Sequence, residues 1–229
     1  MEITPIAYIK NDFSDKFGIP RQSGTTGVVS KIVFNEGYRD ASALRGLDGF
    51  SHIWLIWGFS ENIGKGWSPT VRPPRLGGNR RVGVFATRSP FRPNPLGLSC
   101  VKIVSIGKER GNGNVLYVSG ADMLDGTPIF DIKPYVSYTD SVPDAACGFA
   151  EEHKNDFVPV VFPEELYEKL PEGRREQVKA MLAQDPRPAY QNDGERVYGF
   201  GFAGYEIRFR YSDGAISVVS VEKTEKAGG

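Results

Sequence analysis

The first 140 residues contain glycine, proline and asparagine so often that helices of ordinary length have little room to form. Between these residues stand short runs rich in β-branched and aromatic side chains, which favour extended backbone. We predict strands over residues 6–10, 27–34, 52–59, 81–86, 98–106, 114–120 and 129–135. Many short strands at this spacing are typical of a closed barrel or a sandwich. The sequence therefore predicts a mainly β N-terminal domain, a β-barrel or sandwich, with one short helix over residues 40–47.

The composition changes after residue 140. Residues 141–160 are rich in small and acidic side chains, which is typical of a linker or an extended arm. Beyond them we predict helices over residues 163–170 and 174–184, followed by antiparallel strands over residues 197–202, 205–211 and 215–221. The predicted organisation is an N-terminal domain over residues 1–140, a linker or arm over 141–160, and a small α+β domain over 161–229.

The totals of the chain exclude several classes of protein. Its 28 basic and 28 acidic residues cancel, so net charge favours neither nucleic acid nor any other partner. The chain has two cysteines, Cys100 and Cys147, which are too few for a disulfide framework. With His52 and His153 they make no run at metal-ligand spacing, so we expect no structural metal. The N-terminus lacks the basic start and long apolar core of a secretion signal, and no apolar run is long enough to span a bilayer. We therefore expect a cytoplasmic protein.

Residues 199–204, Gly-Phe-Gly-Phe-Ala-Gly, match the glycine fingerprint of dinucleotide-binding proteins letter by letter. That fingerprint works because a helix follows the glycines and its N-terminus receives the pyrophosphate. Here the next residues, 205–211, alternate in polarity as a strand does. The context therefore argues against a Rossmann site, and any adenosyl cofactor would need another scaffold.

No acidic residue stands between Glu61 and Glu109. The interval nevertheless holds nine basic residues, namely Lys65, Arg72, Arg75, Arg80, Arg81, Arg88, Arg92, Lys102 and Lys108. Prolines and glycines around the arginines indicate stiff loops that hold guanidinium groups in place, which suits phosphate oxygens and unstacked bases. Arg72, Arg75 and Arg92 are our candidates for nucleic-acid contact. The alternative is that these arginines form ordinary salt bridges with the acidic residues after position 122.

Six stretches resemble, in their order along the chain, the TsaA-like or TrmO-type tRNA methyltransferases. They are Lys16-Phe-Gly-Ile-Pro-Arg-Gln22, Ser51-His-Ile-Trp54, Arg72-Pro-Pro-Arg-Leu-Gly-Gly78, the run from Arg81 to Ser99, the run from Asp125 to Tyr135, and Asp185-Pro-Arg-Pro-Ala-Tyr190. One such stretch would be weak evidence. Their number and order extend the resemblance over nearly the whole chain.

The resemblance implies an N-terminal β-barrel that binds S-adenosylmethionine without a Rossmann fold, a smaller C-terminal domain, and a homodimer. It also implies a reaction: methylation of N6 of the adenosine that follows the anticodon, in threonine tRNA whose base already carries a threonylcarbamoyl group. The positions that match the family's cofactor contacts are Gln22, Ser23, Gly24, Phe59, Ser60, Arg88, Leu98, Asp122, Met123, Leu124 and Asp125.

The residue chemistry is compatible with this donor. A carboxylate such as Asp122 can accept hydrogen bonds from a ribose diol, and Arg88 can hold an α-carboxylate. Methyl transfer also needs an acceptor for the N6 proton, and the sequence leaves Asp125, Asp131 and Tyr135 open as candidates.

Several side chains also have a purely structural interpretation. Strand alternation places Asp131 and Lys133 on one face, where they would form an ion pair. His52 is expected to be a structural hydrogen-bonding residue, and Trp54 and Trp57 to fill the barrel core. The proline-rich loop with Asp185, Arg187 and Tyr190 is our second candidate for tRNA contact, since arginine and tyrosine suit phosphates and unstacked bases. Packing within the protein is the alternative for that loop.

Two other functions remain open from the sequence. A non-catalytic RNA-binding module would use the same arginines and would explain the lack of an assured general base. A small-molecule methyltransferase would use the same cofactor residues without RNA.

Overall fold

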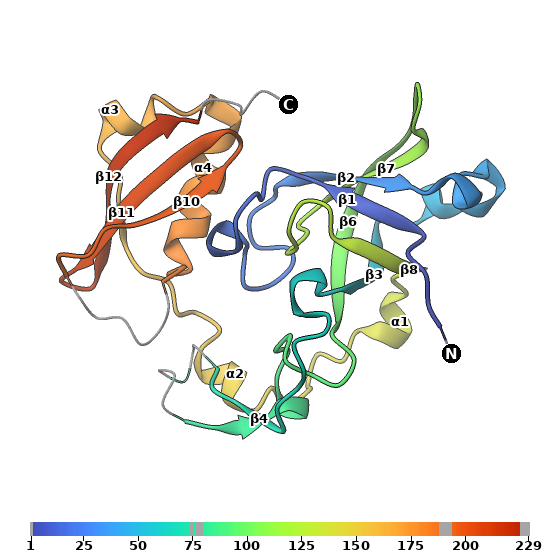
Figure 1. The fold of residues 1–229 in the computed structure, drawn as a ribbon, viewed down its shortest axis with the longest axis horizontal. Helices are drawn as coiled ribbons and strands as arrows, with labels where there is room; N and C mark the ends of the chain where they lie inside the picture. The colour runs from blue at the N-terminus through green and yellow to red at the C-terminus, as the bar shows by residue number, and fades with distance from the viewer. Residues whose placement is uncertain (1, 74–75, 77–79, 188–193, 225–229) are drawn as a thin grey trace. The chain divides into compact units, whose positions relative to one another are not determined.

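The computed structural model describes residues 2–73, 76, 80–187 and 194–224, and the chain forms two compact units (Figure 1). Unit 1 comprises Met1–Asn11 and Gln22–Ala146, and unit 2 comprises Asp12–Arg21 and Cys147–Gly229. The division differs from the predicted one in residues 12–21, which we assigned to the N-terminal domain but which pack with the C-terminal unit. The expectation of a mainly β protein is confirmed.

Unit 1 is built on six strands, all paired antiparallel. They are β1 (Ala7–Lys10), β2 (Val29–Phe34), β3 (His52–Gly58), β6 (Leu96–Glu109), β7 (Gly113–Ser119) and β8 (Pro128–Pro134). Their order around the sheet is β1-β2-β7-β6-β3-β8, and the sheet closes into a barrel because β1 pairs with both β2 and β8.

Alternation along the strands fills the barrel interior. In β3, Ile53, Leu55 and Trp57 are buried, while the residues between them face outward. Trp57 therefore belongs to the core, as predicted. The prediction was wrong for Trp54, because alternation along β3 points its side chain to the outer face of the barrel. There its indole Nε1 donates to Asp140 Oδ2 at 2.9 Å. Asp140 lies in the short helix α1 (Ser137–Asp140).

Two local predictions in unit 1 were wrong. The helix expected over residues 40–47 consists of two 3-10 turns, Ala41–Leu44 and Leu47–Gly49, because Gly46 between them has a φ of 85° and cannot continue a helix. The strand expected over residues 81–86 is only β5 (Val82–Gly83), which pairs with β4 (Thr70–Val71). The chain then enters a 3-10 turn, Val84–Ala86, whose first side chain is buried.

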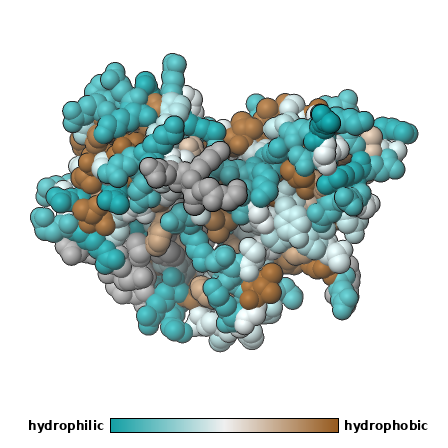
Figure 2. Space-filling model, turned by 45° about the horizontal axis from the view of Figure 1, so that its top comes forward, coloured by the Kyte–Doolittle hydropathy of each residue, from teal (hydrophilic) through white to brown (hydrophobic). Residues whose placement is uncertain are grey.

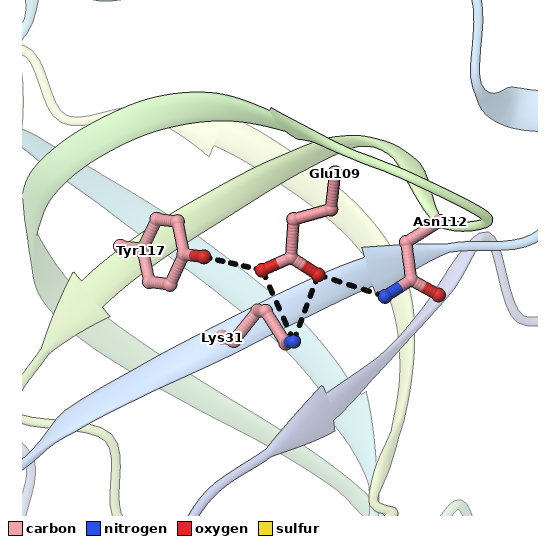
Figure 3. Close-up of polar contacts among 4 residues, drawn as sticks. All are labelled: Lys31, Glu109, Asn112 and Tyr117. Carbon is pink, nitrogen blue, oxygen red and sulfur yellow. Dashed lines mark hydrogen bonds and ion pairs between the residues drawn. The ribbon is translucent and has the colours of Figure 1, made fainter.

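A carboxylate cluster ties three strands together on the outer surface of the barrel (Figure 3). Glu109 at the end of β6 accepts hydrogen bonds from Lys31 Nζ at 2.9 and 3.2 Å and from Asn112 Nδ2 at 2.8 Å, and also from the Tyr117 hydroxyl. These donors, led by Tyr117, lower the pKa of Glu109 to about 2. Because each of its partners comes from the β2, β6 or β7 region, the cluster is a structural brace.

Unit 2 packs helices against a four-stranded sheet of order β10-β11-β12-β9. The strands are β9 (Val160–Val161), β10 (Tyr198–Phe202), β11 (Tyr205–Ser212) and β12 (Ala215–Lys223), and the helices are α2 (Phe149–Glu152), α3 (Glu164–Tyr167) and α4 (Glu172–Ala183). The helix predicted over residues 163–170 shrinks to the one turn of α3, because Pro171 follows closely and begins α4. Among the described residues, no helix has the length and apolar character needed to cross a membrane.

The fingerprint-like glycines of unit 2 form a hairpin. Phe202 pairs with Tyr205, so Ala203 and Gly204 are the two turn residues between β10 and β11. Both have positive φ, 52° and 79°, as the tight type I′ turn requires. The residues after the turn form β11, which confirms the strand predicted to follow these glycines.

The segment 12–21 joins unit 2 through aromatic packing. Phe13 is fully buried and its ring centroid lies 5.6 Å from that of Phe202. A side chain at Gly18 would lie 2.8 Å from the ring of Phe200, so only glycine fits there. Sequence pattern alone could not show that this N-terminal stretch leaves the barrel.

Candidate functional site

The barrel topology brings the predicted cofactor segments to one end of unit 1. At this end β1, β3 and β7 finish, while β2, β6 and β8 start. Residues 22–24 precede β2, residues 59–60 follow β3, residues 88–98 lead into β6, and residues 122–125 connect β7 to β8. Segments separated by up to 100 positions in the sequence therefore share one rim of the barrel.

Asp122 is the centre of a polar cluster at this rim. Its Oδ1 accepts a hydrogen bond from Ser99 Oγ, and Ser99 in turn accepts one from Trp57 Nε1 at 2.9 Å. Burial raises the pKa of the Asp122 carboxyl, while hydrogen bonds from Ser99 and the backbone and the charge of Arg88 oppose that rise. The chain thus holds a desolvated carboxyl group in a defined orientation, and its hydrogen bonds and the charge of Arg88 offset only part of the free-energy cost of burial.

Residues from the 22–24 segment complete this cluster. Arg88 Nη1 donates to Gln22 Oε1 at 2.8 Å, and the Ser23 backbone contributes to the hydrogen bonding of Asp122. Gly24 N donates to Gly120 O at 2.8 Å. A side chain at Gly120, whose φ is 89°, would lie 2.8 Å from Gly24 Cα, so the close approach of the two backbones requires glycine.

Apolar side chains border the cluster. The Phe59 ring lies 4.4 Å from that of Trp57, centroid to centroid. A side chain at Gly97 would lie 2.2 Å from the Trp57 ring, so the indole occupies the space that any larger residue would need. Leu98 is 55% exposed and, by alternation along β6, points to the opposite face of the strand from Ser99.

The remaining predicted cofactor residues have mixed positions. Met123 is buried in the core, so only its backbone reaches the rim, where its carbonyl accepts from Asn11 Nδ2 at 2.9 Å. The Leu124 carbonyl accepts from Thr127 N at 3.2 Å and closes a turn. Ser60 is exposed and starts a 3-10 turn after β3.

The three candidates for the proton acceptor are not brought together. Asp125 lies at the same rim, where it accepts from Asn11 N at 3.0 Å and lies 3.4 Å from Lys10 Nζ. Asp131 sits on the outer face of β8 and forms the predicted ion pair with Lys133 at 3.1 Å. Tyr135 follows β8 at the opposite barrel end, with its backbone N donating to His52 O.

His52 makes only local contacts. Its Nδ1 hydrogen bonds with Ser51 Oγ at 2.9 Å, and its ring lies 6.3 Å from that of Tyr135. Both partners lie at the barrel end away from Asp122. This arrangement agrees with the structural role predicted for the histidine.

The exposed arginines of unit 1 do not form, among the described residues, the salt bridges that the alternative interpretation expects. Arg72, Arg80, Arg81 and Arg88 are exposed, and none of them forms an ion pair with a carboxylate within the described part of the chain. Arg92 instead braces its own loop, with Nη1 donating to Thr87 O at 3.0 Å and Ser89 O at 3.3 Å. Arg75 lies outside the described residues.

The loop predicted to contact tRNA in unit 2 is engaged internally. Arg187 has a side chain only 7% exposed, and its Nε and Nη2 donate to the two carboxylate oxygens of Asp185 at 2.7 and 2.8 Å. The guanidinium also lies 3.3 Å from the centroid of the Tyr211 ring. In this conformation Arg187 makes internal packing contacts, as the alternative interpretation of the loop expects, and its contact with tRNA stays a prediction. Tyr190 lies outside the described residues.

Sequence reasoning missed Ser99 and Trp57 as parts of the site. Ser99 closes the quoted run from Arg81 to Ser99, but only the register that pairs it with Leu55 shows that it faces inward. No metal-ligating group of three or more His, Cys, Asp or Glu side chains occurs among the residues that the structure describes.

The fold and the site define a class of two-unit proteins. One unit is a β-barrel with the polar cluster of Asp122 at one rim, and the other is an α+β unit. Two family models match the chain in order: the tRNA-methyltransferase O N-terminal domain over residues 8–141 and the TrmO C-terminal domain over residues 155–224. The chain therefore belongs to the tRNA-methyltransferase O family.

Similar proteins of known sequence and structure agree. The tRNA (adenine(37)-N6)-methyltransferase of Escherichia coli K12 is 38% identical over 226 residues, which are 95% of this chain and 96% of that protein. A protein of the same name from Eikenella corrodens is 48% identical over 176 residues, covering 77% of this chain and 99% of its own. A crystal structure of TrmO from P. aeruginosa has a TM-score of 0.75 at 33% identity and covers 97% of each chain.

Proposed function

We infer that this chain is an S-adenosylmethionine-dependent methyltransferase that acts on N6 of adenine 37 in tRNA. The observation that carries this inference is its 38% identity to the E. coli enzyme of that name over nearly the full length of both chains. Both family domains are present in the same order, so the whole chain and not one module is matched.

We assign the methyl-donor site to the rim around Asp122. The fit rests on the desolvated Asp122 carboxyl and on Thr26 Oγ1, a buried hydroxyl near the same rim that has no hydrogen-bond partner among the described residues. Both are polar groups suited to a ligand with hydroxyl and amine donors. S-adenosylmethionine supplies a methyl group on a sulfonium sulfur when it is bound.

The chain's own residues would bind and orient this donor. Asp122 accepts from ribose hydroxyls, and Arg88, whose guanidinium keeps free donors beside its bond to Gln22, binds the α-carboxylate. Phe59 supplies an apolar wall. Because the residues are held by main-chain and side-chain hydrogen bonds, they are aligned before the donor arrives, which favours an in-line transfer.

For the proton released from N6, we favour Asp125 over Asp131 and Tyr135. Asp125 is the only one of the three at the rim that holds the other cofactor residues. Asp131 lies on the outer face of β8, away from this rim, and Tyr135 lies past the far end of β8. Asp125→Asn should then lower turnover at a saturating concentration of the methyl donor, whereas equal turnover would exclude the carboxylate as the base.

We further propose, from the sequence resemblance, that the substrate is threonine tRNA carrying a threonylcarbamoyl group on adenine 37, and that a homodimer performs the reaction in the cytoplasm. A carbonyl beside N6 would make its proton more acidic, so a modest base such as a carboxylate would suffice.

The test is transfer of label from S-adenosylmethionine to threonine tRNA with the threonylcarbamoyl group present or absent. Label on the modified tRNA alone supports the full proposal, and equal labelling of both removes the requirement for that group. No label on either, with the modification verified, contradicts the methyltransferase. Sedimentation of the same preparation tests the homodimer.

A second test addresses the orientation of Asp122. Ser99→Ala removes the hydroxyl that donates a hydrogen bond to this carboxylate. The affinity for S-adenosylmethionine should therefore fall about tenfold. Because the Ser99 hydrogen bond lowers the pKa of Asp122, its loss should also shift the pH dependence of binding upward. Ser99→Thr, which keeps the hydroxyl, should restore the wild-type profile, and an unshifted profile in Ser99→Ala would assign Ser99 to packing alone.

The two alternative functions predict different results in binding and turnover experiments. A non-catalytic RNA-binding module would bind tRNA without binding S-adenosylmethionine in a calorimeter. A small-molecule methyltransferase would turn over at the same rate with and without RNA.

A further inference from the structure

Three stretches of unit 1 that carry exposed aromatic side chains are joined by main-chain hydrogen bonds. β4 pairs with β5, and Val84 N donates to Pro69 O at 3.0 Å. Ser68 N donates to Phe91 O at 3.3 Å. Because of these bonds, the residues just before β4, just after β5 and near position 91 belong to one lobe, which is formed by the long connection from β3 to β6 and contains the β4 strand labelled in Figure 1.

Each stretch presents one large aromatic side chain to solvent. Trp67 is 54% exposed, Phe85 76% and Phe91 47%. Apolar residues reach the surface at several places in this molecule (Figure 2), but these three stand on braced backbone. Val84, next to Phe85, is buried, and Thr87 Oγ1 donates to its carbonyl at 2.9 Å. Exposed apolar side chains indicate a binding surface more strongly when their backbone is held by hydrogen bonds than when they lie on a loose loop.

The charges around these aromatics select one class of partner. Arg72, Arg80 and Arg81 are exposed, and none of them has a carboxylate within ion-pair distance in the described part of the chain. Residues 62–108 contain no acidic side chain. Guanidinium groups beside aromatic rings are the combination that binds phosphates and unstacked bases together. A second copy of this face would oppose it with arginines of the same sign, which disfavours self-association through it.

We propose that Trp67, Phe85 and Phe91 form a stacking surface for unpaired bases of the tRNA anticodon loop, while the neighbouring arginines bind its phosphates. This inference rests on the proposed tRNA methyltransferase function and extends it to residues that the reaction itself does not identify. The aromatics determine how the loop is held, and the cluster around Asp122 holds the methyl donor.

The test replaces each aromatic with leucine, which keeps an apolar surface and removes the ring. Tyr138→Leu is the matched control, because Tyr138 is 88% exposed in the same unit but outside the arginine segment. Binding of threonine tRNA is measured at several salt concentrations, together with donor binding, methyl transfer at saturating tRNA, unfolding midpoint and sedimentation mass.

Each aromatic variant should weaken tRNA binding about tenfold, the size of one lost base stack. Its salt dependence, donor affinity, unfolding midpoint and sedimentation mass should stay as in the wild type and in Tyr138→Leu. Unchanged tRNA affinity in all three variants would overturn the proposal, and so would a loss accompanied by a fall in sedimentation mass, since the face would then join two copies. If the unaltered protein transfers no methyl to tRNA, the proposed function fails instead, and the two failures are thus distinct.

Discussion

Two loops that contain both arginine and proline place their arginines in opposite environments. In unit 1 the loop over residues 80–92 leaves Arg81 and Arg88 exposed, and neither forms an ion pair with a carboxylate among the described residues. In unit 2 Arg187 is buried against Asp185 and the Tyr211 ring. The same residue types therefore make an open cationic surface in one unit and a packing clamp in the other.

The difference depends on the local supply of acceptors. Asp185 stands two residues before Arg187 in the same loop, so a bidentate pair forms without any distant partner. The segment 62–108 offers its arginines no carboxylate of its own. The presence or absence of a nearby acidic residue thus distinguishes an arginine that packs within the protein from one that is available to RNA.

The largest expected effect is on the unit 2 clamp. Arg187→Ala removes the partner of a carboxylate that is only 27% exposed, and should lower the free energy of unfolding by about 2–3 kcal/mol. Urea unfolding measures this loss. A variant of unchanged stability that binds tRNA with a reduced salt slope would show that Arg187 contacts phosphate after all, and the comparison would break.

A smaller effect is expected in unit 1. Arg81→Gln should leave the unfolding midpoint unchanged, because the one hydrogen bond of the guanidinium to a described residue goes to Thr70 Oγ1, on the exposed surface, at 2.7 Å. Its tRNA affinity should fall several-fold and the salt slope of log affinity should decrease by about 0.7–0.9, the value for one phosphate. Arg45→Gln, outside the segment, is the control. A destabilised Arg81 variant with an unchanged slope would place Arg81 in the structural class.

The smallest effect concerns a fully paired charge in unit 1. The pKa of Glu109 is lowered to about 2, so its contribution to stability is present above its ordinary pKa of 4.5 and is lost as pH falls toward 2. Glu109→Gln should therefore flatten the acid side of the stability profile and leave tRNA and donor binding unchanged at neutral pH. An acid profile identical to the wild type would show that the brace in Figure 3 does not control it.

Much of the fold followed from local patterns. Short β-branched and aromatic runs between glycine, proline and asparagine predicted the six barrel strands, and alternation predicted the strands of the tail hairpins. Local rules failed at residues 40–47, where Gly46 adopts positive φ, and at residues 12–21, which pack on the far unit's strands. Positive φ and long-range packing leave weak marks on sequence.

The site was predicted at the level of segments and less well for individual side chains. Gln22, Arg88 and Asp122 do meet at one rim, although they are up to 100 residues apart. Met123 and Leu98 share those segments, but one is buried and the other faces outward. Which side of a strand or turn a residue occupies depends on register, and register became visible only in the structure.

The most direct test of the account is calorimetric titration of S-adenosylmethionine into the wild-type protein and into Asp122→Asn. Burial raises the pKa of Asp122, so the folded protein is stabilised by the protonated form below the ordinary carboxyl pKa and loses that stability as pH rises through the raised value. The asparagine variant should therefore be at least as stable as the wild type at neutral pH, yet bind the donor about a hundredfold more weakly, the loss of a buried charged acceptor. Wild-type donor affinity in a folded Asp122→Asn protein would contradict the assignment of the methyl-donor site.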